Sequence, residues 1–449
     1  MDIIGLLPQA GGLIWIIVAF VVALSVIVTI HEYGHYIVGR WSGIHADVFS
    51  LGFGPVIYKR TDKRGTQWQI AALPFGGYVK FAGDANAASG KDVDAMHAAE
   101  ADAVALRRTM HGAPLWARAA TVAAGPVFNF VFSVLLFAAL FLSTGVTRDQ
   151  MTVGKLRALP AEVNDLQPGD EILQIAGRPV PLIRDDSFGP FLSSLPKTTQ
   201  LDYRVNRDGA DLDVQGPQLF PPLVVGLVPR SAAYQADLDV GDVIVAVNGT
   251  PISVFEELKN TVEASDGAPV ALQVWRDGAV LDKTLSAKRV DEPQADGSYK
   301  TEWRIGIAGG MAFELATEPM GVWRALGDGV AETGGIITGS LSGLGHIITG
   351  AISTCNLSGP IGIAQTSGAM ASQGTQSFLR FIAVLSTAVG LLNLFPIPAL
   401  DGGHLVFYGY EAVAGRPPSD KVLRVMMAAG LAMILTLMVF ALGNDIFCP

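Results

Sequence analysis

The residues of this sequence that could do chemistry stand together near its start, at positions 31–35, which read His-Glu-Tyr-Gly-His. In a helix, His31 and His35 are one turn apart on the same face, so both imidazoles can reach one metal ion. Glu32 projects close by without being a ligand, and it can move a proton from a metal-activated water to a leaving amine. Imidazole plus carboxylate with one open position suits zinc-dependent hydrolysis, so zinc is the expected metal.

The setting of this motif strengthens the metal interpretation. The pattern H-E-x-x-H is short and occurs by chance in many chains, so taken alone it leaves a structural role open. Here it ends an apolar run, from Gly12 to Ile30, that contains no charged residue. Ionisable groups are costly in such a span and are by default functional. We therefore favour a metal site.

The composition indicates a membrane protein with soluble parts. The 449 residues suffice for two to four domains, and 50% of them are hydrophobic while only 16% are charged. The net charge of −10 argues against nucleic acid as a partner. The first twelve residues lack a basic region and a cleavage site, so we expect the first apolar run to be a retained span rather than a signal peptide.

Four segments are long and apolar enough to cross a bilayer as helices. Residues 1–30 and the tail after Leu442 carry no Lys or Arg, whereas the loop from Arg40 to Arg118 carries ten. Positive-inside counting therefore puts both termini outside the cell membrane and the loops after the first and third spans in the cytoplasm. The expected spans are about Leu13–Val38, Ala119–Leu142, Phe381–Leu394 (continuing irregularly to Leu400) and Val425–Leu442.

A third metal ligand is expected at the end of the third span, in the stretch 393–404 that reads NLFPIPALDGGH. Pro396 and Pro398 cannot sit inside a continuing helix, so the backbone must unwind there. Asp401 then lies at an irregular break on the same side of the membrane as the first motif, which makes it the best candidate. A helix-capping aspartate is the alternative for this position, and His404 is a weaker rival ligand.

Residues 47–83 follow the metal helix and read as two strands around a turn at 63–65. Such a hairpin could dip toward the site and offer a strand edge to an extended substrate, although an ordinary cytoplasmic hairpin remains open. Residues 84–112 are rich in Ala and Asp and are expected to be loosely structured. The candidate substrate-binding residues are Gly76, Gly77, Asn393, Pro396 and Pro398.

The second span carries Gly125, Pro126 and Asn129 among apolar residues. Glycine permits close contact between helices, and an asparagine in hydrocarbon must find a hydrogen-bonding partner. We expect these residues to serve packing rather than catalysis.

Residues 150–292 contain two copies of one unit. Gly169-Asp170 recurs 72 residues later as Gly241-Asp242, and the stretch LQPGDEILQIAGRPV is matched by LDVGDVIVAVNGTPI. Both stretches resemble PDZ domains, and that resemblance implies a groove that binds extended peptide by strand addition. Spacer domains without a ligand are the alternative.

Residues 316–353 carry Ile and Leu at helical spacing, without Lys, Arg, Asp or Glu between Gly334 and Ser353. A fifth span there would place the end of the next span across the bilayer from His31, so we expect a helix lying on the outer surface instead. The two cysteines, Cys355 and Cys448, are then on the same outer side, and a disulfide could join them.

The order of motifs resembles one family. HEYGH in the first span, GPVFN in the second, the PDZ-like pair, SGPIGIA at 358–364 and NLFPIPALDGG in the third are similar to the bacterial site-2 proteases, which are intramembrane zinc metalloproteases. The resemblance implies cleavage of single-span membrane proteins, such as an anti-sigma factor already trimmed outside, and of remnant signal peptides. It implies that the PDZ pair is periplasmic and screens substrates by size. It assigns zinc to His31, His35 and Asp401, catalysis to Glu32 and substrate handling to Asn393.

We therefore expect a mainly α, polytopic protein of the bacterial inner membrane, with four transmembrane helices, a membrane-associated β-hairpin and two tandem PDZ-like α+β domains. A non-proteolytic PDZ-containing scaffold or chaperone is the alternative function, and a transporter is disfavoured because no inverted repeat is visible among the spans. The expected segments are 1–46 (first span), 47–118 (cytoplasmic loop with the hairpin), 119–145 (second span), 150–221 and 222–292 (PDZ-like domains), 293–375 (periplasmic linker with interfacial helices), 376–403 (third span) and 404–449 (cytoplasmic loop and fourth span).

Overall fold

The computed structural model describes residues 7–85, 90–160, 163–294 and 298–448. The chain divides into two compact units. The first comprises Met1–Leu140, Val322–Gly350 and Thr354–Cys448, and it is mainly helical. The second comprises Phe141–Gly321 with Ala351–Ser353, and it is mainly strands.

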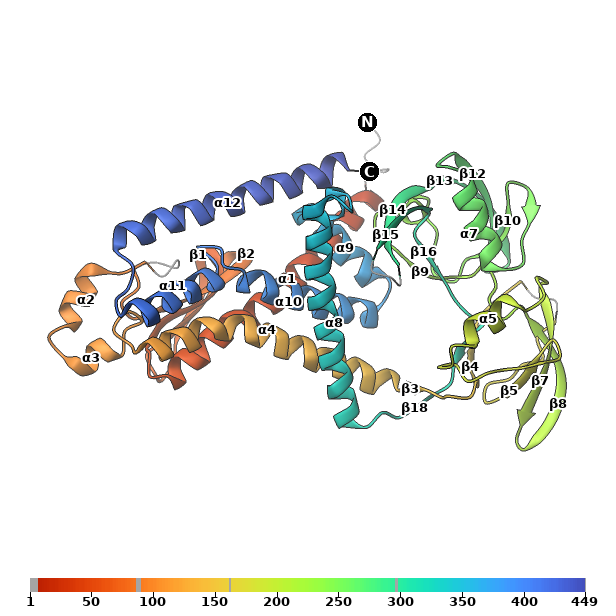
Figure 1. The fold of residues 1–449 in the computed structure, drawn as a ribbon, viewed down its shortest axis with the longest axis horizontal. Coiled ribbons are helices and arrows are strands. Elements are labelled where there is room, and N and C mark those ends of the chain that lie inside the picture. Colours follow the sequence, from red (N-terminus) through yellow and green to blue (C-terminus); the bar gives the residue numbers. More distant parts are fainter. Residues whose placement is uncertain (1–6, 86–89, 161–162, 295–297, 449) are drawn as a thin grey trace. The chain divides into compact units, whose positions relative to one another are not determined.

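Four helices among the described residues are long and apolar enough to cross a membrane, as the sequence predicts (Figure 1). Each extends the expected span at one or both ends, because the flanking residues continue the helix beyond the apolar stretch. They are α1 (Leu7–Trp41), α4 (Leu115–Thr144), α10 (Thr375–Leu394) and α12 (Asp420–Phe447).

Helix α4 has one face of small and polar residues that packs inside the first unit. Thr121, Gly125, Asn129 and Ser133 follow one another at intervals of four and are all buried. Ser133 Oγ donates a 2.7 Å hydrogen bond to the carbonyl oxygen of Ala383 in α10. Small residues let helices approach closely in an apolar medium, and the buried hydroxyls satisfy backbone groups across the contact. Pro126 lies inside this helix without ending it.

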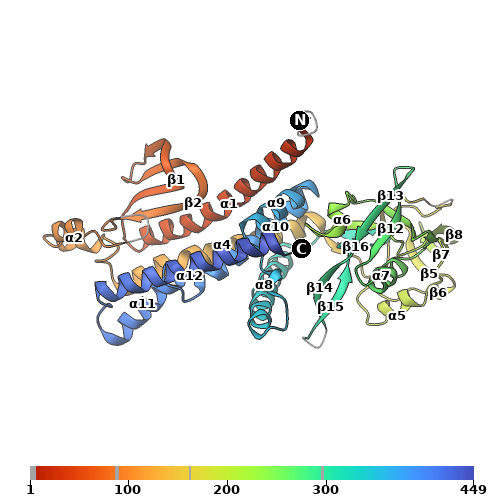
Figure 2. The same ribbon diagram turned by 90° about the horizontal axis from the view of Figure 1, so that it is seen from above.

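The expected hairpin is confirmed. Strand β1 (Ala46–Thr61) pairs antiparallel with β2 (Gln67–Phe81). The turn between them is closed by Asp62, whose carboxylate accepts hydrogen bonds from the backbone N–H groups of Arg64 (2.8 Å) and Thr66 (3.0 Å). Both strands contact α1, and Figure 2 shows the hairpin lying beside the C-terminal half of that helix.

The expectation that residues 84–112 are loosely structured is wrong for the residues that the structure describes. This segment contains two short helices, α2 (Val93–Ala99) and α3 (Ala103–Arg107). Each begins with a capping aspartate: Asp92 accepts from the third residue after it and Asp102 from the second. The Asp content that suggests a solvated loop therefore includes residues that start helices.

The second unit contains two four-stranded antiparallel sheets with the same strand order, as two copies of one sequence unit should give. In each sheet the strands lie in the order second, first, third and fourth of the copy. The second strand, at the edge, has only two residues. The first sheet is β6 (Arg178–Pro179), β5 (Glu171–Ile175), β7 (Gln200–Arg207) and β8 (Ala210–Pro217), with helix α5 (Phe188–Ser193); the second is β11 (Thr250–Pro251), β10 (Val243–Val247), β12 (Pro269–Arg276) and β13 (Ala279–Ser286), with helices α6 (Ala232–Gln235) and α7 (Phe255–Ala264).

An equivalent ion pair between arginine and aspartate is present in both copies. The guanidinium of Arg207 binds the buried carboxylate of Asp170, with Nε 2.7 Å from Oδ1. Arg276 binds Asp242 in the same way, at 2.6 Å. Burial alone would raise the pKa of Asp170, but the hydrogen bonds from Arg207 hold that pKa below its ordinary value. The repeated Gly-Asp motif therefore serves the fold of each copy.

Residues after the second copy pair back with earlier strands rather than forming a plain linker. Strand β14 (Lys288–Pro293) pairs with β15 (Tyr299–Arg304). The next three strands also pair with earlier strands. The first two pair with the strands that precede the two sheets, and the third pairs with the strand just after α4. They are β16 (Ile307–Gly309) with β9 (Val224–Leu227), β17 (Phe313–Leu315) with β4 (Val153–Leu156), and β18 (Thr317–Glu318) with β3 (Val146–Thr147).

Three further helices complete the first unit. The segment expected to lie on the membrane surface contains a single helix, α8 (Val322–Thr349), which is not among the four candidate spans. Helix α9 (Pro360–Ser372) packs against α1. The stretch after the third span contains helix α11 (Asp401–Ala414), which ends at Gly415 in the left-handed conformation that favours glycine.

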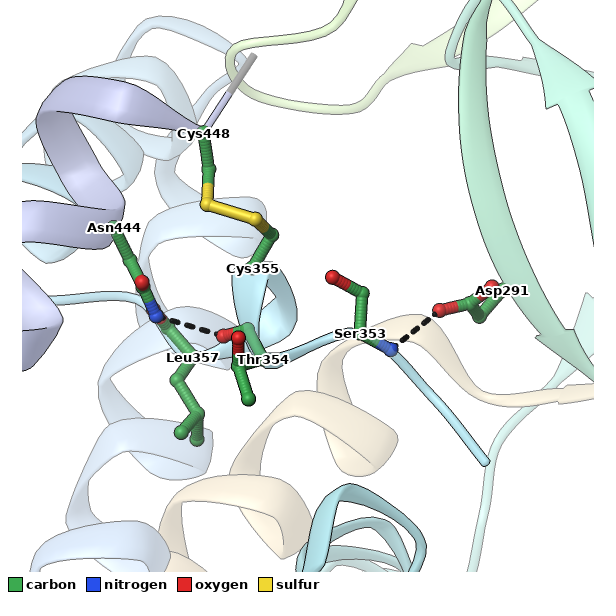
Figure 3. The surroundings of a disulfide bond; sticks show 7 residues. All are labelled: Asp291, Ser353, Thr354, Cys355, Leu357, Asn444 and Cys448. Carbon is green, nitrogen blue, oxygen red and sulfur yellow. Dashed lines mark hydrogen bonds between the residues drawn. A yellow bond between two sulfur atoms is a disulfide. The ribbon is translucent and has the colours of Figure 1, made fainter. Parts of the chain in front are cut away.

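A disulfide joins Cys355 to Cys448, across 93 residues of sequence (Figure 3). Cys355 lies in the short 3-10 helix η1 (Thr354–Asn356), and Cys448 caps the end of α12. Beside it, the Asn444 amide donates a 2.7 Å hydrogen bond to the carbonyl oxygen of Thr354. The carboxylate of Asp445 accepts hydrogen bonds from two backbone N–H groups at the start of α9. The disulfide and these hydrogen bonds together hold the end of α12 against the segment before α9.

We expect neither cysteine of the purified protein to react with a thiol alkylating reagent until a reductant is added, after which both should react. Mass spectrometry of the intact chain would count the adducts. Replacing Cys448 with serine should leave Cys355 reactive without reductant and lower the free energy of unfolding by about 2–4 kcal/mol. Equal labelling with and without reductant would contradict the pairing.

Candidate metal centre

The three expected ligands converge in the structure. His31 and His35 lie one turn apart on α1, and Asp401 is the first residue of α11. Asp401 Oδ2 lies 3.1 Å from His31 Nε2 and 3.5 Å from His35 Nε2, and the two Nε2 atoms are 3.1 Å apart. One ligand atom from each residue therefore lies within 4.8 Å of the others.

The break between α10 and α11 brings Asp401 to this position. The helix ends at Leu394, and the next residues run through the two prolines that the sequence marks as helix breakers. Ala399 has a φ of 83°, a left-handed conformation that costs a residue other than glycine about 1–3 kcal/mol. A Cβ on Gly402 would lie 2.3 Å from the carbonyl oxygen of Phe395. Only glycine lets the backbone fold back so closely next to the aspartate.

Both imidazoles are held from α4 through their second ring nitrogen. His35 Nδ1 lies 2.8 Å from the backbone carbonyl oxygen of Thr121. His31 Nδ1 lies 3.3 Å from the side-chain amide of Asn129. These contacts leave both Nε2 atoms facing Asp401. Metal-binding histidines are usually oriented in this way, by a partner of the nitrogen that does not bind the ion.

Two observations test whether this cluster suits a metal ion. Asp401 Oδ2 is buried and faces both imidazoles without a hydrogen bond of normal geometry. Gly125 of α4 lets both rings lie close against that helix, because a Cβ there would lie 2.3 Å from His35 Nε2 and 2.8 Å from His31 Cε1. Two imidazoles and one carboxylate are the donor set of a catalytic zinc site. The residues fit the metal.

Glu32 lies beside this cluster and against strand β2. The backbone N–H of Val79 hydrogen-bonds to its carboxylate, and both histidines and Asp401 act on it electrostatically. A Cβ on Gly77 would lie 3.2 Å from Glu32 Cγ. The hairpin glycine therefore permits the strand to approach the carboxylate.

The other candidate residues lie near the site but not in the metal cluster. Asn393 donates its side-chain hydrogen bond to the carbonyl oxygen of Val389 in its own helix, 3.0 Å away. Gly76 has a φ of 136° and packs under the Phe53 ring. Burial lowers the pKa of His404 and favours a neutral ring, but this weaker candidate is not in the cluster.

Pro396 and Pro398 stand in the break between α10 and α11. Helix α12 contacts this break closely, because a Cβ on Gly430 would lie 1.8 Å from the carbonyl oxygen of Pro398. The fourth span therefore packs against the segment that precedes Asp401.

Sequence reasoning missed the parts of the site that α4 supplies. Gly125 and Asn129 are expected as packing residues, and in addition to packing they contact the histidines. A signal for this role exists in the sequence. One face of this apolar span carries small and polar residues at intervals of four, which are Thr121, Gly125, Asn129 and Ser133.

Comparison with known proteins points to one peptidase family. Residues 19–437 match the profile of peptidase family M50. The chain is 35% identical over 445 residues to a protein of Agrobacterium fabrum named as a zinc metalloprotease, covering 98% of each chain. It is 33% identical over 465 residues to the regulator of sigma-E protease RseP of Salmonella typhimurium, covering 97% of this chain and 99% of that protein.

The chain therefore belongs to peptidase family M50. This family is zinc-dependent, so the enzyme is a zinc metalloprotease, and the resemblance found in the sequence is confirmed. Its four long apolar helices make it an integral membrane protein.

Proposed function

We propose that this chain hydrolyses a peptide bond of single-span membrane proteins, with zinc held by His31, His35 and Asp401. The observation that carries the proposal is the convergence of three ligand atoms within 4.8 Å in a unit built from apolar helices. A carboxylate and two imidazoles in such a place need a functional reason.

The chain's own groups have distinct tasks in this mechanism. Zinc, when bound, supplies a Lewis acid that polarises the scissile carbonyl and lowers the pKa of a water molecule. Glu32 takes the proton of the attacking water and delivers it to the leaving amine. The Thr121 carbonyl oxygen accepts from His35 Nδ1–H, which keeps the Nε2 lone pair available as a ligand.

Substrate backbone must be extended to react, because an intact helix covers its carbonyl groups with internal hydrogen bonds. We assign this task to the hairpin and to the break between α10 and α11. Strand β2 passes Glu32 at Gly77, so a peptide pairing beside it would lie near the reacting groups. Asn393 would then hydrogen-bond substrate backbone. The assigned substrate contacts are Gly76, Gly77, Asn393, Pro396 and Pro398.

The relatives and the repeats support the proposed substrate class. One relative is named regulator of sigma-E protease RseP, which supports an anti-sigma factor, trimmed beforehand outside the membrane, as a substrate. Remnant signal peptides have the same single-span character. The two sheets of the second unit are proposed to be PDZ-like domains, with the boundaries 150–221 and 222–292, that screen the outer ends of substrates.

The proposed topology follows the distribution of Lys and Arg. Both termini and the PDZ-like pair lie in the periplasm of a bacterial inner membrane, α8 lies on the outer surface, and the active site opens toward the cytoplasmic side. The bonded cysteines Cys355 and Cys448 agree with an oxidising outer compartment.

Metal removal tests the proposal. The purified protein, reconstituted in lipid vesicles with a single-span reporter, should cut the reporter, stop after treatment with a zinc chelator, and resume when zinc is restored. Reporter fragments would be measured by mass spectrometry. A scaffold or chaperone would instead hold the reporter intact whether or not zinc is present, and that outcome would refute the protease proposal.

A further inference from the structure

The two zinc-binding histidines differ in how α4 holds them. His35 Nδ1 faces a backbone carbonyl oxygen, that of Thr121, which no side-chain substitution removes. His31 Nδ1 faces a side chain, the amide of Asn129, at 3.3 Å. The orientation of one ligand is therefore open to test by mutation.

Asn129 is well placed to hold a ring rigidly. It has no solvent exposure, and its backbone carbonyl oxygen accepts a 3.0 Å hydrogen bond from Ser386 of α10. Its Oδ1 atom is buried and makes no hydrogen bond in the described structure. A buried acceptor without a partner costs about 1–3 kcal/mol, so this amide oxygen needs a hydrogen-bond donor.

The chemistry of His31 supplies that donor. A ring that binds a metal through Nε2 carries its proton on Nδ1, so Nδ1 is then a donor. If the amide nitrogen of Asn129 faced this Nδ1–H, two hydrogen-bond donors would face each other. Rotation of the amide by half a turn exchanges its oxygen and nitrogen, and the oxygen then accepts from Nδ1–H.

We propose that Asn129 is a positioning residue for the metal site: its amide oxygen accepts the Nδ1–H of His31 and so fixes the ring with Nε2 toward the ion. This inference rests on the proposed zinc site.

The test compares zinc affinities of full-length variants in detergent by competition with a chelator of known affinity. Asn129→Leu keeps the size but removes the hydrogen bond, and it should weaken zinc binding by about 10- to 100-fold. Asn129→Asp offers only acceptor oxygens and should keep the affinity within a few-fold of the wild type. The matched control is Ser133→Ala, one turn further along α4, which loses buried hydrogen bonds to α10 but should bind zinc normally.

Cobalt substitution gives a second readout, because the visible absorption of bound Co²⁺ reports ligand geometry. The Asn129→Leu spectrum should differ from that of the wild type, whereas the Ser133→Ala spectrum should match it. If Asn129→Leu does not fold, Asn129→Ala takes its place in both comparisons.

Two results would overturn the inference. One is equal zinc affinity in Asn129→Leu and Ser133→Ala, and the other is a loss in Asn129→Asp as large as in Asn129→Leu. A wild-type protein that binds no zinc would instead refute the proposed function itself, so the two failures are distinguishable.

Discussion

Replacing Glu32 with glutamine is expected to reduce cleavage of a single-span reporter by about 10²- to 10⁴-fold while zinc stays bound. Glutamine has nearly the same shape as glutamate, but it cannot accept the proton of the attacking water. Glu32 lies beside the three ligands and is not one of them. Zinc content by mass spectrometry and fragment yield over time would measure the two halves of this prediction.

The control for this variant is Glu332→Gln. Glu332 is a carboxylate of α8 that pairs with Arg380 at 2.7 Å and takes no part in the site. The Glu332→Gln protein should cleave the reporter at the wild-type rate. Substantial cleavage by Glu32→Gln would remove the proton-transfer role, and loss of zinc in that variant would mean that Glu32 acts on the metal instead.

Substituting Gly125 with alanine is expected to abolish both zinc binding and cleavage. The added methyl group would lie 2.3 Å from His35 Nε2, far inside contact distance, and would displace the two rings. In an ordinary helix interior the same change stabilises the protein by roughly 0.5–1 kcal/mol, because alanine is the better helix former. The predicted loss is therefore a specific effect of the site.

Gly334→Ala provides the comparison, since Gly334 also lies inside a helix and a Cβ there would meet nothing within 4 Å. This variant should keep its zinc and its activity. Both proteins would be assayed for zinc per chain and for thermal unfolding. A Gly125→Ala protein that retained stoichiometric zinc would show that the close packing of the histidines against α4 is not needed.

The sequence predicts best where the signal is local. H-E-x-x-H places two imidazoles on one helical face, and unbroken apolar runs mark the four spans. Asp401 is found by a less local argument, because two prolines force a break and the parity of the spans puts that break on the side of His31. The repeat is found from identical residues at a constant offset, and both copies form sheets of the same order.

Contacts between helices are harder to predict. Asn129 stands 98 residues from His31, and only the packing of α4 on α1 decides that its amide meets that ring. The short strands near residues 307–318 are equally difficult. Each has only two or three residues, and its partner lies far away in sequence, so neither propensity nor alternation indicates the pairing.

Local polarity misleads in one other place, and the local sequence is incomplete in a second. Residues 92–107 look solvated because they contain several aspartates, yet Asp92 and Asp102 cap the two short helices found there. Helix α11 begins at Asp401 itself, whereas the sequence indicates only an irregular break at this residue. The two glycines that follow are required by close backbone contacts of the break, and the chain is helical from that point.

Zinc content of the Asp401→Ala protein tests the central claim most directly, because this residue brings a carboxylate from α11 to the two histidines near the start of the chain. Wild type and variant would be purified in detergent, equilibrated at the same free zinc concentration and analysed by mass spectrometry for zinc per chain. We predict one zinc per chain in the wild type and a loss of most of it in Asp401→Ala. A variant that kept the full complement of zinc would contradict the account.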